Sequence, residues 1–293
     1  MKVIDRQSGK ECIEKIYGAA SLRFLYDGGS FASFLLHYLV RYPFFSKFYG
    51  LLQKSRWSRY KIVPFIKAHE VDVSEFVLPV SSFCSFNDFF TRQLKLQARP
   101  IAASDFIIPA DGRYLFFPNI DLCEGIWVKG KKMNLEKLVG DKNLAESYKE
   151  GTLVIGRLCP SDYHRYHFPV DGQISASRLL NRWLYSVNPI ALKKNIEIFT
   201  ENRRIVNEVE TLYGKILIIE VGATCVGSIH HQFEVGDEVK KGAEMGYFSF
   251  GGSCLILLFP KGMIKIDEDL LTLGASGIEV RCLMGQPLAK IEN

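Results

Sequence analysis

The sequence predicts an α+β protein in which a helical N-terminal region, residues 1–100, packs on a strand-rich core, residues 101–293. Three observations support this class. Apolar residues recur at helical spacing in the first part, for example over 35–40. Short apolar runs bounded by glycine and Asp-Gly turns fill the second part. With 293 residues, 47% of them hydrophobic, the chain can bury a core and is neither disordered nor fibrous.

The helical part is expected to cover most of residues 10–95. Pro43 should close the helical segment that ends at Val40, because proline lacks the backbone donor that a helix interior needs. Ser85 is a suitable N-cap ahead of an aromatic pair, so a short helix is predicted to begin there and to end by Arg99-Pro100.

The core is expected to be a compact β-barrel or sandwich. Strands are predicted at the apolar runs 152–155, 216–221 and 255–259, and a short helix at 134–139. The sequence contains no internal repeat and no low-complexity segment.

The cysteines and the lengths of the apolar runs indicate the cellular compartment of the protein and whether it spans a membrane. Seven cysteines, an odd number without a CxxC pair, favour a reduced compartment over a disulfide framework. The first residues lack an apolar signal segment, so we expect no secretion. The longest charge-free runs, 28–40 and 245–260, fall short of the roughly 20 residues of a membrane-spanning helix.

The net charge of +5 is unevenly distributed along the chain. Residues 1–100 carry 15 Lys and Arg against 8 Asp and Glu, whereas the remaining residues carry 22 against 24. No acidic residue lies between Asp27 and Glu70, where basic and aromatic residues are interleaved. Such a segment suits an anionic surface, either a membrane or a nucleic acid.

A glycine pair precedes a serine near the end of the chain. Gly251 and Gly252 allow backbone conformations that are closed to other residues, and Ser253 follows them ahead of an apolar run. The segment fits a turn before a core strand. It also fits a serine that attacks the preceding carbonyl group when a base activates it.

Two further segments contain side chains suited to proton transfer. His164 and His167 fit core histidines, an acid–base pair or two metal ligands, but no Cys or carboxylate set completes a convincing metal site. Asp111, followed by glycine, fits a turn or a carboxylate that orients a histidine.

The order and flanks of these segments resemble the phosphatidylserine decarboxylases, a family of pyruvoyl-dependent membrane enzymes of phospholipid synthesis. The resemblance runs over most of the chain. The matching segments are SFNDFFTRQLKLQARPI at 85–101, PADGR at 109–113, VKGKKMNLEKLVG at 128–140, RLCPSDYHRYHFPVDG at 157–172, LYSVNP at 184–189, VGATCVGSI at 221–229 and VKKGAEMGYFSFGGSC at 239–254.

The resemblance implies an enzyme that processes itself. The family's cleavage serine matches Ser253, and cleavage after Gly252 would give a β-chain of residues 1–252 and an α-chain of residues 253–293. Ser253 would attack the Gly252 carbonyl group, and elimination and hydrolysis of the resulting ester would leave a pyruvoyl group. This group would form the Schiff base with phosphatidylserine, which is converted to phosphatidylethanolamine and CO2.

The resemblance also assigns roles to the polar residues. The family's triad-like aspartate and histidine match Asp111 and His167, which would activate the serine. Its additional active-site histidine matches His164, which would reprotonate the product. Tyr185 and Asn188, in the LYSVNP segment, are candidates for substrate binding. Cys254 stands where the family usually has Thr or Ser; we expect processing nevertheless, and at least as well after Cys254→Ser.

A lipid substrate implies a membrane partner. We expect a peripheral protein on the cytoplasmic face of the cell membrane, a heterodimer of its own two chains that could oligomerise further, with no metal and no nucleic acid as partner. Four aromatic residues should insert among acyl chains and five basic residues should face headgroups: Phe44, Phe45, Phe48, Trp57, Arg41, Lys47, Lys54, Arg56 and Arg59. Alternatively, the aromatic residues form the core of the helical region.

Two other functions remain possible from the sequence. Residues 235–242 resemble the hairpin of biotinyl and lipoyl carrier domains, but the Met-Lys context of the modified lysine is absent. A Ser-His-Asp hydrolase is the second, although the chain has no G-x-S-x-G elbow.

Overall fold

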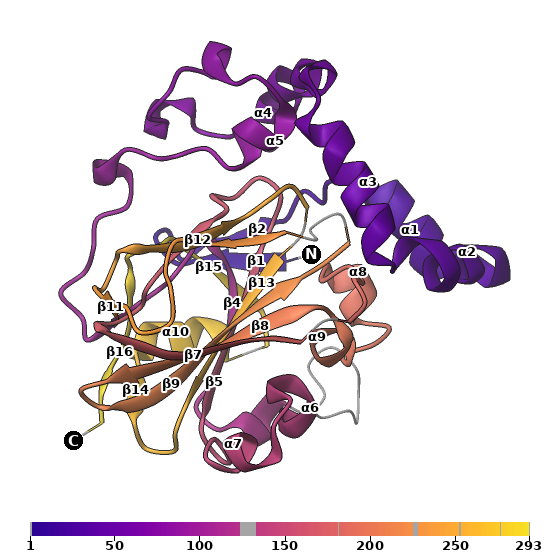
Figure 1. Ribbon diagram of the computed structural model, residues 1–293. Helices are drawn as coiled ribbons and strands as arrows, with labels where there is room; N and C mark the ends of the chain where they lie inside the picture. The colour runs from indigo at the N-terminus through magenta and orange to yellow at the C-terminus, as the bar shows by residue number, and fades with distance from the viewer. Residues whose placement is uncertain are drawn as a thin grey trace.

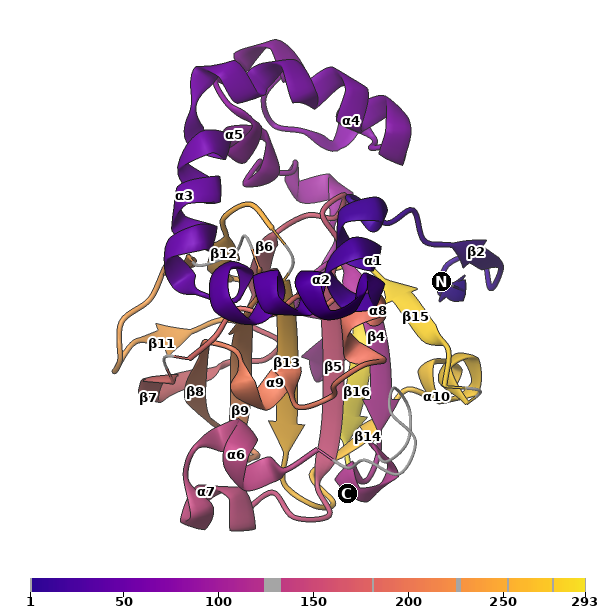
Figure 2. The same cartoon turned by 90° about the vertical axis from the view of Figure 1, so that its right-hand side faces the viewer.

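The computed structural model of the protein describes residues 2–123, 133–180, 182–224, 228–251, 253–275 and 277–292. Within them, the largest element is a ten-stranded sheet, seen in Figure 2. Its strands are, in spatial order, β11 (Glu238–Val239), β7 (Gly172–Leu180), β8 (Arg204–Thr211), β9 (Gly214–Gly222), β13 (Ser253–Phe259), β5 (Thr152–Leu158), β4 (Gly112–Phe117), β15 (Glu279–Cys282), β1 (Lys2–Asp5) and β2 (Glu11–Ile13).

The sheet is mixed and open. Strands β1 and β15 run parallel, whereas β13 is antiparallel to both of its neighbours, β9 and β5. The edge strands β11 and β2 do not pair with each other, so in the described residues the sheet does not close. The predicted α+β class is confirmed, but the β-barrel that we considered for the core is wrong.

Two smaller sheets accompany the main one. One contains β10 (Ile229–His231), β12 (Glu244–Phe248) and β6 (Arg165–His167), and the other contains β14 (Ile264–Ile266), β16 (Pro287–Ile291) and β3 (Phe106–Ile107).

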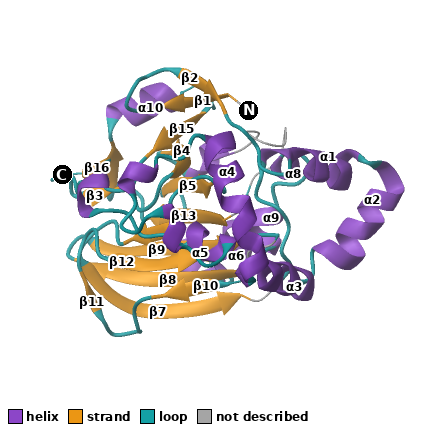
Figure 3. Ribbon diagram, turned by 90° about the horizontal axis from the view of Figure 1, so that it is seen from above, coloured by secondary structure: helices purple, strands orange, loops and turns teal. Residues whose placement is uncertain are grey.

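Helices gather at the two ends of the main sheet (Figure 1). At one end lie α1 (Ala19–Asp27), α2 (Gly29–Leu35), the π-helix η1 (Leu36–Val40), α3 (Pro43–Lys54), α4 (Ile62–His69), α5 (Phe86–Phe90) and the 3-10 turns η2 (Arg56–Lys61), η3 (Val73–Glu75), η4 (Val80–Ser82) and η5 (Leu96–Ala98). The remaining helices are η6 (Ile120–Cys123), α6 (Leu135–Val139), α7 (Lys142–Glu146), α8 (Pro189–Leu192), α9 (Ile198–Glu201) and α10 (Glu268–Gly274). Seen from above, α1, α2 and α3 project to one side of the strands (Figure 3).

The structure confirms the predicted cap at Ser85 and the short helix predicted at 134–139, but one predicted helix end is wrong. The Ser85 hydroxyl accepts the Asp88 amide at 3.1 Å, and Asn134 caps α6 in the same way. Helix α5 ends at Phe90, earlier than predicted. The preceding segment ends at Val40, ahead of Pro43 as predicted, and Pro43 also begins α3, since the first helical turn needs no donor from it.

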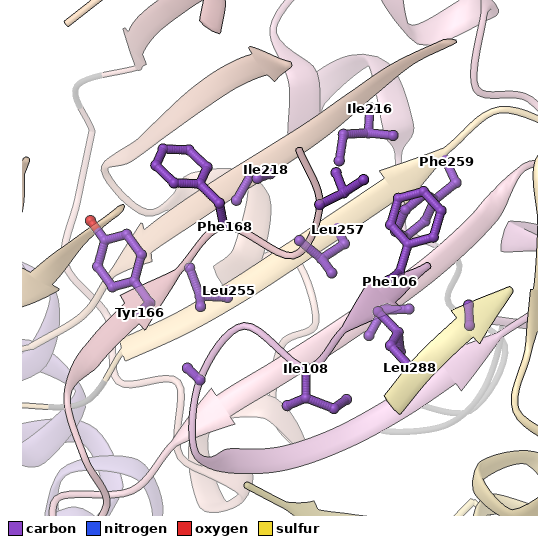
Figure 4. Packing of buried hydrophobic residues seen from close by; sticks show 14 of the residues in the cluster. Phe106, Ile108, Tyr166, Phe168, Ile216, Ile218, Leu255, Leu257, Phe259 and Leu288 are labelled. Atoms are coloured by element: carbon purple, nitrogen blue, oxygen red, sulfur yellow. The ribbon is translucent and has the colours of Figure 1, made fainter. Parts of the chain in front are cut away.

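Side chains alternate between two buried clusters along β13. Cys254, Ile256 and Leu258 belong to the cluster on one face, which also contains Leu36 and Val40 from the N-terminal helices. The cluster on the other face contains Leu255, Leu257 and Phe259 of β13 (Figure 4). It also contains Tyr166 of β6 and Phe168, which follows that strand. The strand therefore separates two hydrophobic layers, and each of its side chains faces one of them.

Candidate active site

Ser253 is the first residue of the central strand β13. It is fully buried, opposite Leu158 on β5 and Gly222 on β9. By alternation its side chain shares the face of Leu255, and its hydroxyl has no hydrogen-bond partner in the described residues. Gly252, the other predicted cleavage residue, lies outside the described residues. The site therefore contains a serine hydroxyl that no structural hydrogen bond occupies.

Cys254 faces the opposite way. Its side chain is buried in the first cluster, and burial raises the pKa of its thiol. The residue that departs from the family pattern thus points into apolar packing, away from the face of Ser253.

The loop before Ser253 is held at three points. The Phe248 amide donates to the His164 carbonyl at 3.0 Å, and the Ser249 amide donates to the Ser228 carbonyl at 3.2 Å. The Phe250 amide donates to the Asn87 side chain at 2.9 Å. Gly251 has a φ of 143°, a conformation that favours glycine. Anchors from three segments therefore fix the path of the chain up to the predicted cleavage point.

His164 lies beside this loop and is a neutral base. It is fully buried, and its ring packs against Phe90 with centroids 3.9 Å apart and the ring planes tilted by 38°. Nδ1 lies 3.0 Å from the Asp162 carbonyl oxygen; since that oxygen can only accept, Nδ1 carries the proton. Burial lowers the pKa of His164 to about 3. Nε2 is buried and has no hydrogen-bond partner among the described residues, so it presents a lone pair.

His167 occupies a different side of its strand. It lies in β6 opposite Glu244, and alternation places its side chain away from Tyr166, which packs in the second cluster. It lines a cavity of about 520 Å³ together with Arg99 and Tyr163. Burial lowers the pKa of His167 to about 4, so this imidazole is also neutral near pH 7.

Asp111 is bound by other groups than the predicted histidine. Its carboxylate accepts from Arg99 Nε at 2.8 Å and Nη2 at 2.6 Å, and from the Met284 amide at 2.9 Å. Arg99 also binds Glu75 at 2.8 Å. Asp111 lines a second cavity, which shares Arg99 with the cavity of His167, and no hydrogen bond joins the predicted triad of Asp111, His167 and Ser253 in the described residues.

A buried ion network beneath the site was not predicted. Arg157 binds Glu279 through two bonds of 2.5 Å and Glu14 at 3.3 Å, and Arg113 binds Asp162. The guanidinium group of Arg92 caps the carbonyls of Ser161 and Asp162 at 3.0 and 3.1 Å. These contacts fix the segment that carries His164. The arginines at 113 and 157 stand inside the matching segments, but sequence alone does not reveal their distant partners.

The two candidate substrate residues lie apart. Tyr185 accepts from Arg41 Nη1 at 2.9 Å and contacts His37 Nδ1 at 3.2 Å. The side chain of Asn188 caps α8 by accepting the Ile190 amide at 3.0 Å. Asn188 also lines a mostly apolar cavity of about 330 Å³ with Tyr49 and Gly251, whereas Tyr185 lines another cavity.

In the described residues, no group of three or more His, Cys, Asp or Glu side chains could hold a metal ion. In the same part of the chain, every helix is too short or too polar to cross a membrane.

Fold and site together define a class: a mixed α+β protein with a buried serine and two neutral histidines suited to acid–base chemistry. The family model described as phosphatidylserine decarboxylase matches residues 86–290. The phosphatidylserine decarboxylase proenzyme of Chlamydia pneumoniae is 44% identical over 290 residues, covering 98% of this chain and 96% of that one. That of Fusobacterium nucleatum is 41% identical over 296 residues, covering 100% and 98%. The chain belongs to the phosphatidylserine decarboxylase family.

Proposed function

We propose that this chain is a proenzyme that cleaves itself and then converts phosphatidylserine to phosphatidylethanolamine and CO2 in phospholipid biosynthesis. The observation that carries the proposal is Ser253: a buried serine with a free hydroxyl at the start of the central strand, after an anchored glycine-containing loop. Membership of a family of carboxy-lyases agrees with it.

Maturation begins with attack of the Ser253 hydroxyl on the Gly252 carbonyl group. The peptide bond gives way to an ester, elimination releases Gly252 as a carboxylate, and hydrolysis with loss of ammonia leaves a pyruvoyl group on the α-chain. The Ser253 side chain, from which this group would form, is fully buried and makes no hydrogen bond in the described residues. When present, the group supplies a carbonyl that takes up the electron pair left by CO2.

The two histidines divide the proton transfers. His167 removes the serine proton under the influence of Asp111, and His164 returns a proton to the product carbon through Nε2. Their neutral state near pH 7 supports both roles. Because Asp111 binds Arg99, pairing it with His167 requires these side chains to rearrange before cleavage.

The N-terminal helices bring the enzyme to a membrane surface. Large apolar side chains project from them into solvent: Phe44 is 59% exposed, Phe48 62% and Trp57 87%. Basic residues lie among them, as expected for a peripheral protein on anionic lipid at the cytoplasmic face. Phe45 and Arg41, which we expected at the lipid, instead contact the first cluster and Tyr185.

The apolar cavity near Asn188 offers a route for the lipid. It is lined by residues of α1 and α3 on one side and by Phe250 and Gly251 on the other. A lipid entering between the helices and the core would thus reach the loop before Ser253.

We also propose that the core is sandwich-like, because residues of all three sheets contribute to one buried cluster.

Phosphatidylethanolamine production from phosphatidylserine vesicles tests the proposal. The purified parent protein should form product, and Ser253→Ala should form none, because it cannot generate the carbonyl group. Cys254→Ser serves as the matched control, since the neighbouring side chain faces the other layer, and it should retain activity. Normal turnover by Ser253→Ala would refute the assignment.

A further inference from the structure

The buried Glu220 and the half-buried His231 form a pair that the chemistry described so far does not use. Glu220, in β9, is fully buried, and His231 lies in β10 of the small sheet. His231 Nε2 is 3.3 Å from Glu220 Oε1, but the two atoms are not aligned for a hydrogen bond. The other carboxyl oxygen accepts from Asn207 Nδ2 at 2.7 Å. A hydrogen bond thus holds one carboxyl oxygen, and His231 lies close to the other without a hydrogen bond to it.

The pair lies on the same face of the main sheet as the side chain of Ser253. Across β13 and β9, Ser253 pairs with Gly222 and Leu255 pairs with Glu220. Glu220 is therefore the diagonal neighbour of Ser253, and such neighbours lie about 7–8 Å apart, within reach of long side chains. Gly222, directly opposite the serine, has no side chain, so β9 places none between Ser253 and Glu220.

Several polar atoms of this layer remain unpaired. In the described residues, four atoms of this layer are buried without a hydrogen-bond partner: Glu220 Oε1, His231 Nε2, and the hydroxyls of Ser253 and Tyr166. Buried polar atoms in native proteins nearly always have partners, so a group of unpaired ones on one face calls for a functional reason. Burial also raises the pKa of Glu220, which strengthens its carboxylate as a base.

We propose that Glu220, held by Asn207 and faced by His231, is the base that removes the Cα proton of Ser253 during maturation. The inference rests on the proposed self-cleavage and concerns its second step, after the ester has formed. The Cα–H bond breaks and its proton passes to the Glu220 carboxylate. The electron pair forms the Cα=Cβ double bond, the Cβ–O bond breaks, and Gly252 leaves with the electrons as a carboxylate.

Glu220→Gln tests the step, because the amide keeps the size of the side chain but cannot act as this base. Maturation, followed by denaturing electrophoresis, should slow at least ten-fold. The ester should accumulate and react with hydroxylamine, which splits esters. Hydroxylamine should then release residues 253–293 with an intact Ser253 and a free amine, as mass spectrometry can read. Glu220→Asp, which retains a carboxylate, should recover part of the maturation rate.

Glu208→Gln is the matched control. Glu208 lies in the neighbouring strand β8, faces the other side of the sheet from Asn207 and binds Lys215 at 2.8 Å, so its loss should leave maturation unchanged. Maturation of Glu220→Gln at the parent rate would overturn the inference. So would a Glu220→Gln chain that hydroxylamine leaves whole while its thermal unfolding matches the parent. A parent chain that never splits would instead refute the proposed function.

Discussion

At the scale of single residues, burial sets the protonation of the two histidines. His164 and His167 have pKa values lowered to about 3 and about 4, chiefly by burial, whereas a histidine in an unfolded chain titrates near 6.5. Both are therefore neutral where the enzyme is expected to work. The same burial that keeps a lone pair on each imidazole makes the fold sensitive to acid.

This sensitivity can be measured on the uncleaved Ser253→Ala chain. Below pH 6.5 these histidines bind protons in the unfolded state but stay neutral in the folded state. The free energy of unfolding therefore falls as the pH falls toward 4. At pH 5 each histidine should cost about 2 kcal/mol relative to pH 7. Adding His164→Gln should remove one such loss in urea unfolding at the two pH values. An equal pH dependence with and without His164 would contradict this account.

The proposed division of labour predicts two different phenotypes. His167→Ala and Asp111→Ala should leave the chain uncut, because the serine then lacks its base. His164→Ala should cut but turn over at least a hundred-fold more slowly. Electrophoresis and product formation separate the cases. A His164→Ala chain that stays whole while His167→Ala matures freely would reverse the two roles.

At the scale of elements, the sequence predicted features that depend on neighbouring residues, but not the pairing of strands that lie far apart in the chain. The Ser85 cap and the apolar run that became β13 depend on neighbouring residues, and both were predicted. Strands β1 and β2 were missed, because Val3 pairs with Glu279 at the far end of the chain and nothing in their short sequences announces it. Residues 10–95 are mostly helical, as predicted, but their first residues form β2 instead of a helix.

The candidate site shows the same limit. Ser253, Asp111 and the histidines were proposed as site residues from matching segments, but the binding of Asp111 to Arg99 and Met284 depends on packing between segments. Glu220 reads in the sequence as one more residue of a strand. Its importance appears only when the register places it diagonally across from the serine.

The exposed face of the N-terminal helices predicts lipid binding. Liposome flotation of the parent protein should rise with the fraction of anionic lipid and fall with salt. Changing Phe44, Phe48 and Trp57 together to Ala should reduce it at least ten-fold, since these side chains are solvent-exposed. Phe45→Ala is the contrast: it should lower stability more than binding, because this ring contacts the first cluster. Binding that ignores the triple change would leave the aromatic face without a membrane role.

At the scale of the whole molecule, cleavage should not separate the two chains. The α-chain would contribute β13, whose strand neighbours β9 and β5 both belong to the β-chain, and it would bury all seven side chains of that strand. The mature protein should therefore elute as one species in gel filtration without denaturant and dissociate only in urea. Separation of the fragments in native buffer would show that β13 does not hold them together.

The most direct test of the central claim is a denaturing mass spectrum of the purified protein. The account predicts two masses, residues 1–252 and residues 253–293, the second blocked at its N-terminus by a pyruvoyl group. Reduction with borohydride should add two mass units to the second chain alone. The Ser253→Ala chain should give one mass near 33.3 kDa. A single intact mass for the parent protein would contradict the account.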